Sequence, residues 1–368
     1  MASLTETAHL LRRGLIFSVL LILAYFVISF GSGLISGLVS PGGGKQIIKA
    51  EVRFGKLPFL HLGGKQATPK SEATAYVLET VTGNFPQTPS MLPVFPLQEQ
   101  PVDILASDEA INLALNLGFP NDPKVLSPTE YLWEMSEQTL RMNILTKNYA
   151  VNPKYEVIFP KGKLTDATAI MNNAKVAIGT GRGLDTSFTD NLISISLLRR
   201  EGTELKLAPS PLEAEVARVD FFRSVEVDKQ EYRLLTGHPQ EALVYLLLGG
   251  GKGQPFLKNY VTWNYDFKRG ATYPLRTLSN AWEEIKSGLG TITLLLGKNG
   301  NYIKTVNLPE IKSITIRQIE ISYFDEEIMQ NFLQPVYVFS GQADLTNNER
   351  VEITIYAPAV DPDWIVKQ

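Results

Sequence analysis

Histidines are the residues most able to build a metal site or a catalytic triad in a chain without cysteine. The sequence has three of them, His9, His61 and His238, and no two stand at the His-x-x-x-His spacing of helical metal ligands. No serine lies in the surroundings that a nucleophile elbow needs. We therefore predict no metal site and no histidine-based triad, and we interpret His61 and His238 as surface loop residues.

Two glycine-rich stretches, 179–183 and 249–253, raise the question of phosphate binding. A P-loop needs Gly-Lys followed by Ser or Thr at the start of a helix, and neither stretch continues in that way. Both are interpreted as turns, because glycine accepts a positive φ. The sequence predicts no cofactor.

Acidic residues cluster at 325–327 and at 283–284. A glycosidase needs two carboxylates at a fixed separation across a cleft, and a sequence does not show that separation. The simpler interpretation is that these acidic residues lie in turns and on the solvent-exposed face of a helix. We predict no catalytic residue and no enzymatic activity, with a cell-wall hydrolase as a minor alternative.

Composition narrows the function classes further. The 368 residues contain no cysteine, which excludes disulfide scaffolds, thiolate zinc sites and cysteine nucleophiles. The formal net charge is only −3, so the sequence gives no electrostatic argument for a nucleic-acid partner. Hydrophobic residues make up 44%, an ordinary share for a folded chain.

The segment 15–39 carries no charged residue and is long enough to cross a bilayer as a helix. We predict a transmembrane signal anchor after a cytoplasmic tail at 1–14, with the lipid bilayer as a partner and the C-terminal region extracytoplasmic. A cleaved signal peptide is the alternative, but the apolar run is longer than such a peptide needs.

Small residues recur every four positions in the second half of this segment, at Ser29, Gly33 and Gly37. Residues four apart lie on one helical face, and small side chains let two helices in a membrane approach closely. The pattern predicts a helix-packing stripe, used for homo-oligomerisation or for a partner's span. A glycine-tolerant helix end without a partner is the alternative.

Three units follow the anchor, each predicted to be a helix and then several strands. A linker with a proline-rich extended lead-in covers 40–101, and the units cover 102–160, 161–276 and 277–368. This order predicts an α+β fold in which repeated helices each pack on an antiparallel sheet. Two apolar strands on either side of 249–254 predict a hairpin within the second unit.

Short stretches of these units carry a family likeness: Leu57 with the proline after it, the helix end at 113–119, Ala281-Trp282, and 333–339. Together they resemble PepSY-like modules, and especially the membrane-anchored regulators of the YycH/YycI type. The strand with proline and aromatics at 335–339 and the next strand at 351–356 match the YycI-type ending. The resemblance implies a regulatory or binding role without catalysis.

These observations predict a membrane-anchored extracytoplasmic binding or regulatory protein that contacts another envelope protein through a sheet face or edge. Trp263, Tyr265, Tyr337 and Phe339 are candidate partner-facing aromatics, because on strands of one face they would form a groove. Ordinary sheet packing is the alternative for them. A structural subunit of an envelope assembly, such as a secretion or pilus-like machine, is the alternative function.

Overall fold

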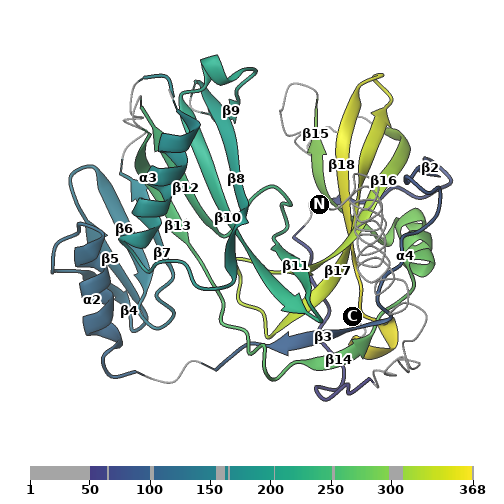
Figure 1. Cartoon of the computed structure of the whole chain (residues 1–368), viewed down its shortest axis with the longest axis horizontal. Coiled ribbons are helices and arrows are strands. Elements are labelled where there is room, and N and C mark those ends of the chain that lie inside the picture. The colour runs from purple at the N-terminus through teal and green to yellow at the C-terminus, as the bar shows by residue number, and fades with distance from the viewer. Residues whose placement is uncertain are drawn as a thin grey trace, which may run out of the picture. The chain divides into compact units, whose positions relative to one another are not determined.

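β-strands dominate the computed structural model of the chain (Figure 1). The structure describes residues 50–63, 66–99, 103–154, 162–164, 166–202, 204–250, 253–297 and 310–366. Within these ranges, 18 strands belong to one hydrogen-bonded network that contains both parallel and antiparallel pairs. The same ranges contain three α-helices.

The first part of the network is a wholly antiparallel sheet. From one edge to the other, its strands are β4 (Lys124–Ser127), β5 (Glu130–Glu134), β6 (Gln138–Asn143), β7 (Tyr149–Pro153), β13 (Gln254–Tyr260), β12 (Val244–Gly249), β10 (Val216–Val227), β8 (Phe188–Glu201) and β9 (Glu204–Leu207). The predicted hairpin around 249–254 is confirmed, because β12 and β13 pair on either side of it.

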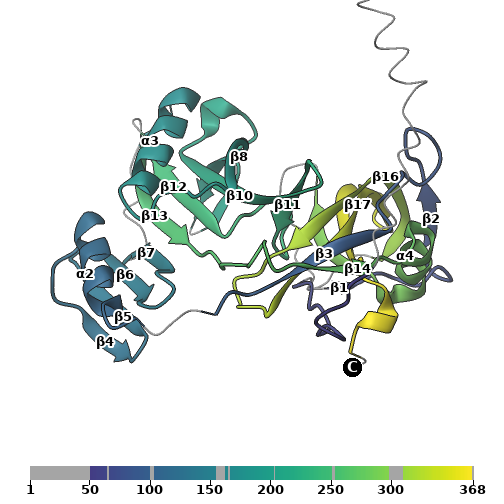
Figure 2. The same cartoon turned by 60° about the horizontal axis from the view of Figure 1, so that its bottom comes forward.

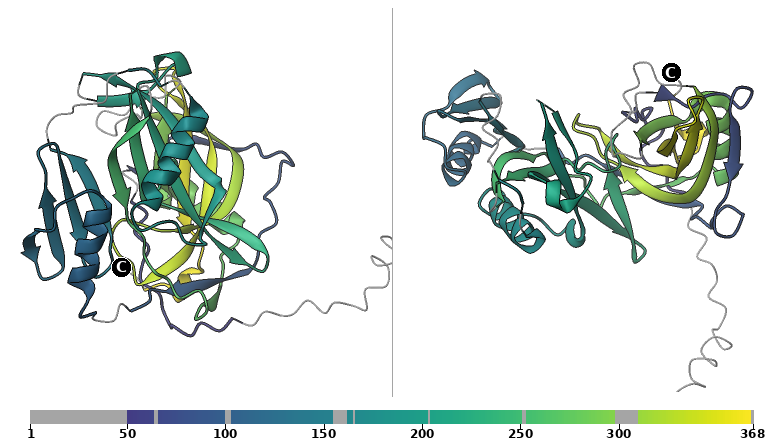
Figure 3. Two further views of the ribbon diagram at one scale, coloured as in Figure 1. Left: turned by 60° about the vertical axis from the view of Figure 1, so that its left-hand side comes forward. Right: turned by 90° about the horizontal axis from the view of Figure 1, so that it is seen from above.

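Helices α2 (Ala106–Asn116) and α3 (Ala167–Gly179) pack on this sheet and share one hydrophobic core with it (Figures 1 and 2). In α2 the buried side chains are alanines four residues apart, which lie on one helical face and let the helix approach the strands closely. Asp166 caps α3 by accepting a hydrogen bond of 2.8 Å from the backbone of Thr168. Figure 3 shows α3, in teal, across the strands that it covers.

The second part of the network is built around a pair of long strands, β16 (Ile311–Phe324) and β17 (Phe332–Leu345), which run antiparallel. Next to β17 the order continues through β18 (Arg350–Pro358), β15 (Thr291–Leu296) and β1 (Gln66–Ala67). The other strands of this part are β2 (Ala75–Leu78), parallel to β16, and β3 (Met91–Pro96), which pairs with β17 and with β14 (Ala271–Pro274). Its helical elements are α4 (Leu278–Glu284) with the turn η2 (Ile285–Leu289), and the short helix η3 (Pro362–Trp364). The short helix η1 (Pro211–Glu213) lies between β9 and β10 of the first part.

One hairpin joins the two parts. β10 lies in the first sheet up to Phe221, and its last residues pair with β11 (Gln230–Leu235). Asp228 and Lys229 have positive φ angles of 51° and 66°, as a two-residue type I′ hairpin requires. β11 then pairs in parallel with the end of β16. Phe221, just before the hairpin, belongs to the core of the first part, whereas Val225, Tyr232 and Leu234 of the hairpin belong to the core of the second part.

The predicted fold class, an α+β fold of repeated helix-on-sheet units, is wrong. The strands assigned to separate units form a large mixed network: β7 pairs with β13, and β11 pairs with β16. Even the lead-in contributes β2 and β3 to the second part. The physical reason is that hydrogen bonds between strands far apart in sequence leave no local pattern, so the order of helices and strands alone suggested closed units.

The prediction of a single-pass membrane protein with an extracytoplasmic region also needs correction. No helix within the described residues is long and apolar enough to cross a bilayer. The predicted span at 15–39 and its stripe of Ser29, Gly33 and Gly37 lie outside the described residues. The structure therefore does not support the membrane assignment, which rested on one apolar run alone.

Candidate functional site

Of the four aromatic residues singled out in the sequence, three lie in the interior and Trp263 is partly buried. Tyr265, Tyr337 and Phe339 are 4% exposed or less. The hydroxyl of Tyr265 bonds to Asp325 at 3.0 Å, that of Tyr337 donates to the carbonyl oxygen of Arg276 at 2.6 Å, and the indole of Trp263 donates to the carbonyl oxygen of Glu326 at 2.7 Å. Their polar tips are thus engaged within the fold, as in ordinary sheet packing.

The other chemistry-bearing residues are dispersed. His61 is exposed, and His238 lies 3.8 Å from the carboxylate of Glu241. The two acidic clusters of the sequence lie apart: Asp325 is buried and pairs with Arg223, whereas Glu284 pairs with Arg276. Among the described residues, no group of three or more histidines and acids stands close enough to hold a metal ion. None of these clusters forms a catalytic constellation.

A cavity of about 840 Å³ lies where β9 leaves the side of β8. Its walls come from β8 and β9, from Arg233 of β11, from the loop after β11, and from Leu296 of β15. This volume falls in the range of small-molecule and cofactor sites. The charged side chains among its lining residues are Arg199, Lys206 and Arg233, so the charge of the wall is entirely positive.

Two of these cations already have partners. Arg199 contacts Glu201 at 2.5 Å and Glu213 at 3.1 Å, and Lys206 contacts the other oxygen of Glu201 at 2.5 Å. The hydrogen bond from Lys206 lowers the pKa of Glu201, so this carboxylate stays ionised and keeps both cations occupied.

Arg233 is different, because it has no hydrogen bond or ion pair to any described residue. Its guanidinium stacks on the ring of Phe222 at 3.5 Å, and its Nε atom is buried without a hydrogen-bond partner. Burial lowers the pKa of Arg233, since the desolvated charged form is disfavoured, and this outweighs the attraction of Glu320 and Asp220. A guanidinium nevertheless stays protonated. The cavity therefore contains a partly desolvated cation with one buried donor, Nε, that lacks a hydrogen-bond partner.

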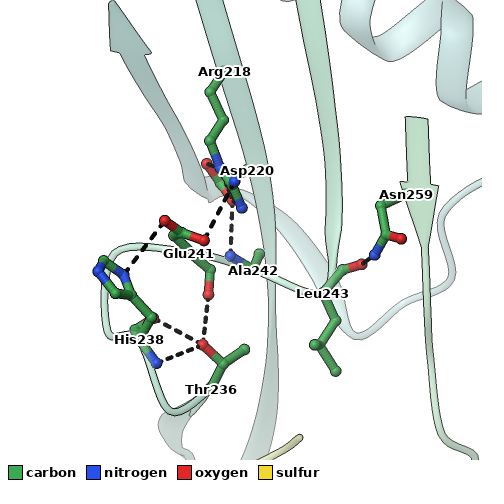
Figure 4. Close-up of polar contacts among 8 residues, drawn as sticks. All are labelled: Arg218, Asp220, Thr236, His238, Glu241, Ala242, Leu243 and Asn259. Atoms are coloured by element: carbon green, nitrogen blue, oxygen red, sulfur yellow. Dashed lines mark hydrogen bonds and ion pairs between the residues drawn. The ribbon is translucent and has the colours of Figure 1, made fainter. Parts of the chain in front are cut away.

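The loop between β11 and β12 forms another wall of the cavity and is tied down by a polar network (Figure 4). Asp220 of β10 receives Arg218 in a bidentate pair, with a closest distance of 2.9 Å, and accepts the backbone N–H of Ala242 at 2.8 Å. Arg218 also reaches Glu241 at 3.3 Å. The network fixes the β12 end of the loop that brings Pro239 and Gln240 to the cavity.

Thr236 is the inner anchor of this loop. Its hydroxyl accepts the backbone N–H of His238 at 3.0 Å and lies 2.8 Å and 2.9 Å from the carbonyl oxygens of His238 and Glu241 (Figure 4). We expect Thr236→Val to lower the free energy of unfolding by about 1–2 kcal/mol and to speed hydrogen exchange in the loop. Urea denaturation and hydrogen exchange check this, with Thr189→Val on β8 as the control. An unchanged loop exchange rate in Thr236→Val would contradict it.

Sequence reasoning missed Arg233. Tyr232 and Leu234 beside it are buried, so simple alternation along β11 places Arg233 on a solvated face. Only its contact with Phe222 across the hairpin reveals a partly desolvated cation. A basic residue between the apolar Tyr232 and Leu234 was the one available signal.

Comparison with known proteins does not identify a family for the chain. No family model and no curated protein matches the chain. Among solved structures, an uncharacterized protein from Eubacterium rectale ATCC 33656 is similar to it with a TM-score of 0.33 and 12% sequence identity. The match covers 73% of this chain and 84% of that protein.

Proposed function

We propose that this chain is a binding protein without catalytic activity, and that its cavity receives an anionic group from the ligand. The observation that carries the proposal is Arg233, a partly desolvated guanidinium that lines the cavity, makes no salt bridge to a described residue and has a buried Nε without a hydrogen-bond partner. A regulatory role, as implied by the resemblance to YycH/YycI-type proteins, belongs to this proposal. A protein is our preferred partner.

The chemistry of the wall supports binding rather than catalysis. Its polar side chains are three cations, two serines and one amide, namely Arg199, Lys206, Arg233, Ser194, Ser196 and Gln240. General acid–base catalysis near neutral pH most often uses a histidine or a carboxylate within reach of the substrate. The described residues that line the cavity include neither.

We expect glutarate, a dicarboxylate probe, to bind the full chain and its diamide not to bind. Arg233→Met should weaken glutarate binding about ten-fold or more, because a charge-assisted hydrogen bond contributes about 1.5–3 kcal/mol. Calorimetric titration measures both. Arg317→Met is the matched control, since Arg317 is half exposed and pairs with Glu79 at the surface. Equal binding of acid and diamide, or equal loss in both variants, would refute the proposal.

A further inference from the structure

The edge of β8 is open beside the cavity. β8 runs from Phe188 to Glu201, but β9 pairs only with its last part, Leu198–Glu201. Residues 193–197 pair with β10 on one side. On the other side, no strand within the described residues continues the line of β9. Natural sheets usually cover or blunt such edges, so an uncovered stretch invites an added strand.

The hydrogen bonds show which backbone groups face this open side. The carbonyl oxygen of Leu198 accepts the N–H of Glu215, which leads into β10, at 2.9 Å. That of Leu197 accepts the N–H of Ala208, just after β9, at 2.8 Å. Alternate residues of a strand face opposite neighbours. Ile193 and Ile195 therefore point their N–H and C=O groups toward the open side.

We infer that an extended, acidic segment of another protein adds as a strand to β8 at Ile193–Ile195, in line with β9, and places a carboxylate on Arg233. The inference rests on the proposed function and names its ligand class. Ile195 and Arg233 line the same cavity, so backbone pairing and charge recognition meet in one place. Main-chain bonds supply affinity in this mode, and side-chain pockets supply specificity.

Charge complementarity selects the acidic segment over an apolar one. The neighbouring cations Arg199 and Lys206 are neutralised by Glu201 and Glu213. Glu320 and Asp220 attract Arg233, but no carboxylate among the described residues contacts it, and one face of its guanidinium is already covered by Phe222. A carboxylate that arrives with the added strand would satisfy this cation without competing with an existing pair.

The test uses an acetylated and amidated heptapeptide of alternating valine and threonine with one central glutamate, and measures its binding to the full chain by fluorescence anisotropy. Replacing the glutamate by glutamine, or Arg233 by methionine, should weaken binding about ten-fold or more. N-methylation of alternate peptide amides should abolish binding. Hydrogen exchange in the wild-type complex should slow at the amide of Ile195, a readout that needs no variant.

Two variants distinguish the contribution of the backbone N–H of Ile195 to peptide binding from that of its side chain. Ile195→Pro removes the N–H on the open side while leaving the bonds to β10, and it should weaken peptide binding about ten-fold or more. Ile195→Ala keeps the N–H and should bind within about two-fold of wild type. Equal effects of the two variants, together with unchanged exchange at Ile195, would overturn the inference.

The outcomes distinguish this inference from the proposed function. If glutarate binds with dependence on Arg233 but the peptide does not bind, the anion site stands and the strand addition fails. If neither binds, both fail. If the full chain forms dimers that Ile195→Pro dissociates, the occupant of the edge is a second copy, and the inference of a different protein is overturned.

Discussion

Gly341→Ala is expected to lower the free energy of unfolding by several kcal/mol. Gly341 lies opposite Ile316 in the pairing of β16 with β17, next to a shift of register. A Cβ at this position would overlap the carbonyl oxygen of Thr315 and lie 2.9 Å from the Cα of Ile316. Both atoms are backbone, so the two longest paired strands would have to separate locally. Overpacking in a tight interior costs about 1–3 kcal/mol, and broken ladder bonds add to it.

A second glycine provides the control. Gly179 ends α3, has no positive φ, and has open space within 4 Å of the place that an alanine methyl group would take. Gly179→Ala should therefore be neutral or slightly stabilising, because alanine is the better helix former. Urea denaturation of both variants gives the comparison. A Gly341→Ala protein as stable as Gly179→Ala would show that β16 and β17 are not packed as described.

Local patterns predicted the helices and the nearest strand pairs, but not the network. A helix was predicted at the start of the unit 102–160, where α2 lies, and the two apolar runs around 249–254 indicated the β12–β13 hairpin. The partners β7 and β13 are about a hundred residues apart, and no residue type marks that pairing. The sequence also suggested surface roles for Tyr337 and Phe339, since aromatics favour strands on either face and only packing decides which face is buried.

The candidate site was beyond sequence reasoning for the same reason. Arg233, Arg199 and Gln240 come from two strands and a loop that meet only through tertiary pairing. Asp325 belongs to an acidic cluster for which the sequence favours a place at the surface. It is buried, and its neighbours Arg223 and Tyr265 come from other strands and loops.

Asp325 provides the second large prediction, because it is an acid held inside the fold. Burial raises its pKa from 3.8 to about 6, against the opposing effects of Arg223 at 3.7 Å and of the Tyr265 hydroxyl. The folded protein therefore holds this proton more tightly than the unfolded chain does. The contribution of Asp325 to stability is largest below pH 4 and is lost as the pH rises toward 6.

Arg223→Met should therefore cost about 3–5 kcal/mol at pH 7.5, where Asp325 would be left as an unpaired buried charge. At pH 5 the loss should be clearly smaller, because Asp325 can then keep its proton. Adding Asp325→Asn should recover most of the stability at pH 7.5, since it removes the charge that Arg223 balances. Urea denaturation at both pH values measures these differences.

Arg269→Met is the control, because Arg269 is 75% exposed and its pair with Asp266 spans 4.0 Å. This variant should lose less than about 1 kcal/mol of stability at either pH. Equal losses at pH 5 and pH 7.5, or no recovery in the double variant, would mean that Arg223 acts through its bonds to Ser187 and Trp263 rather than through the charge of Asp325.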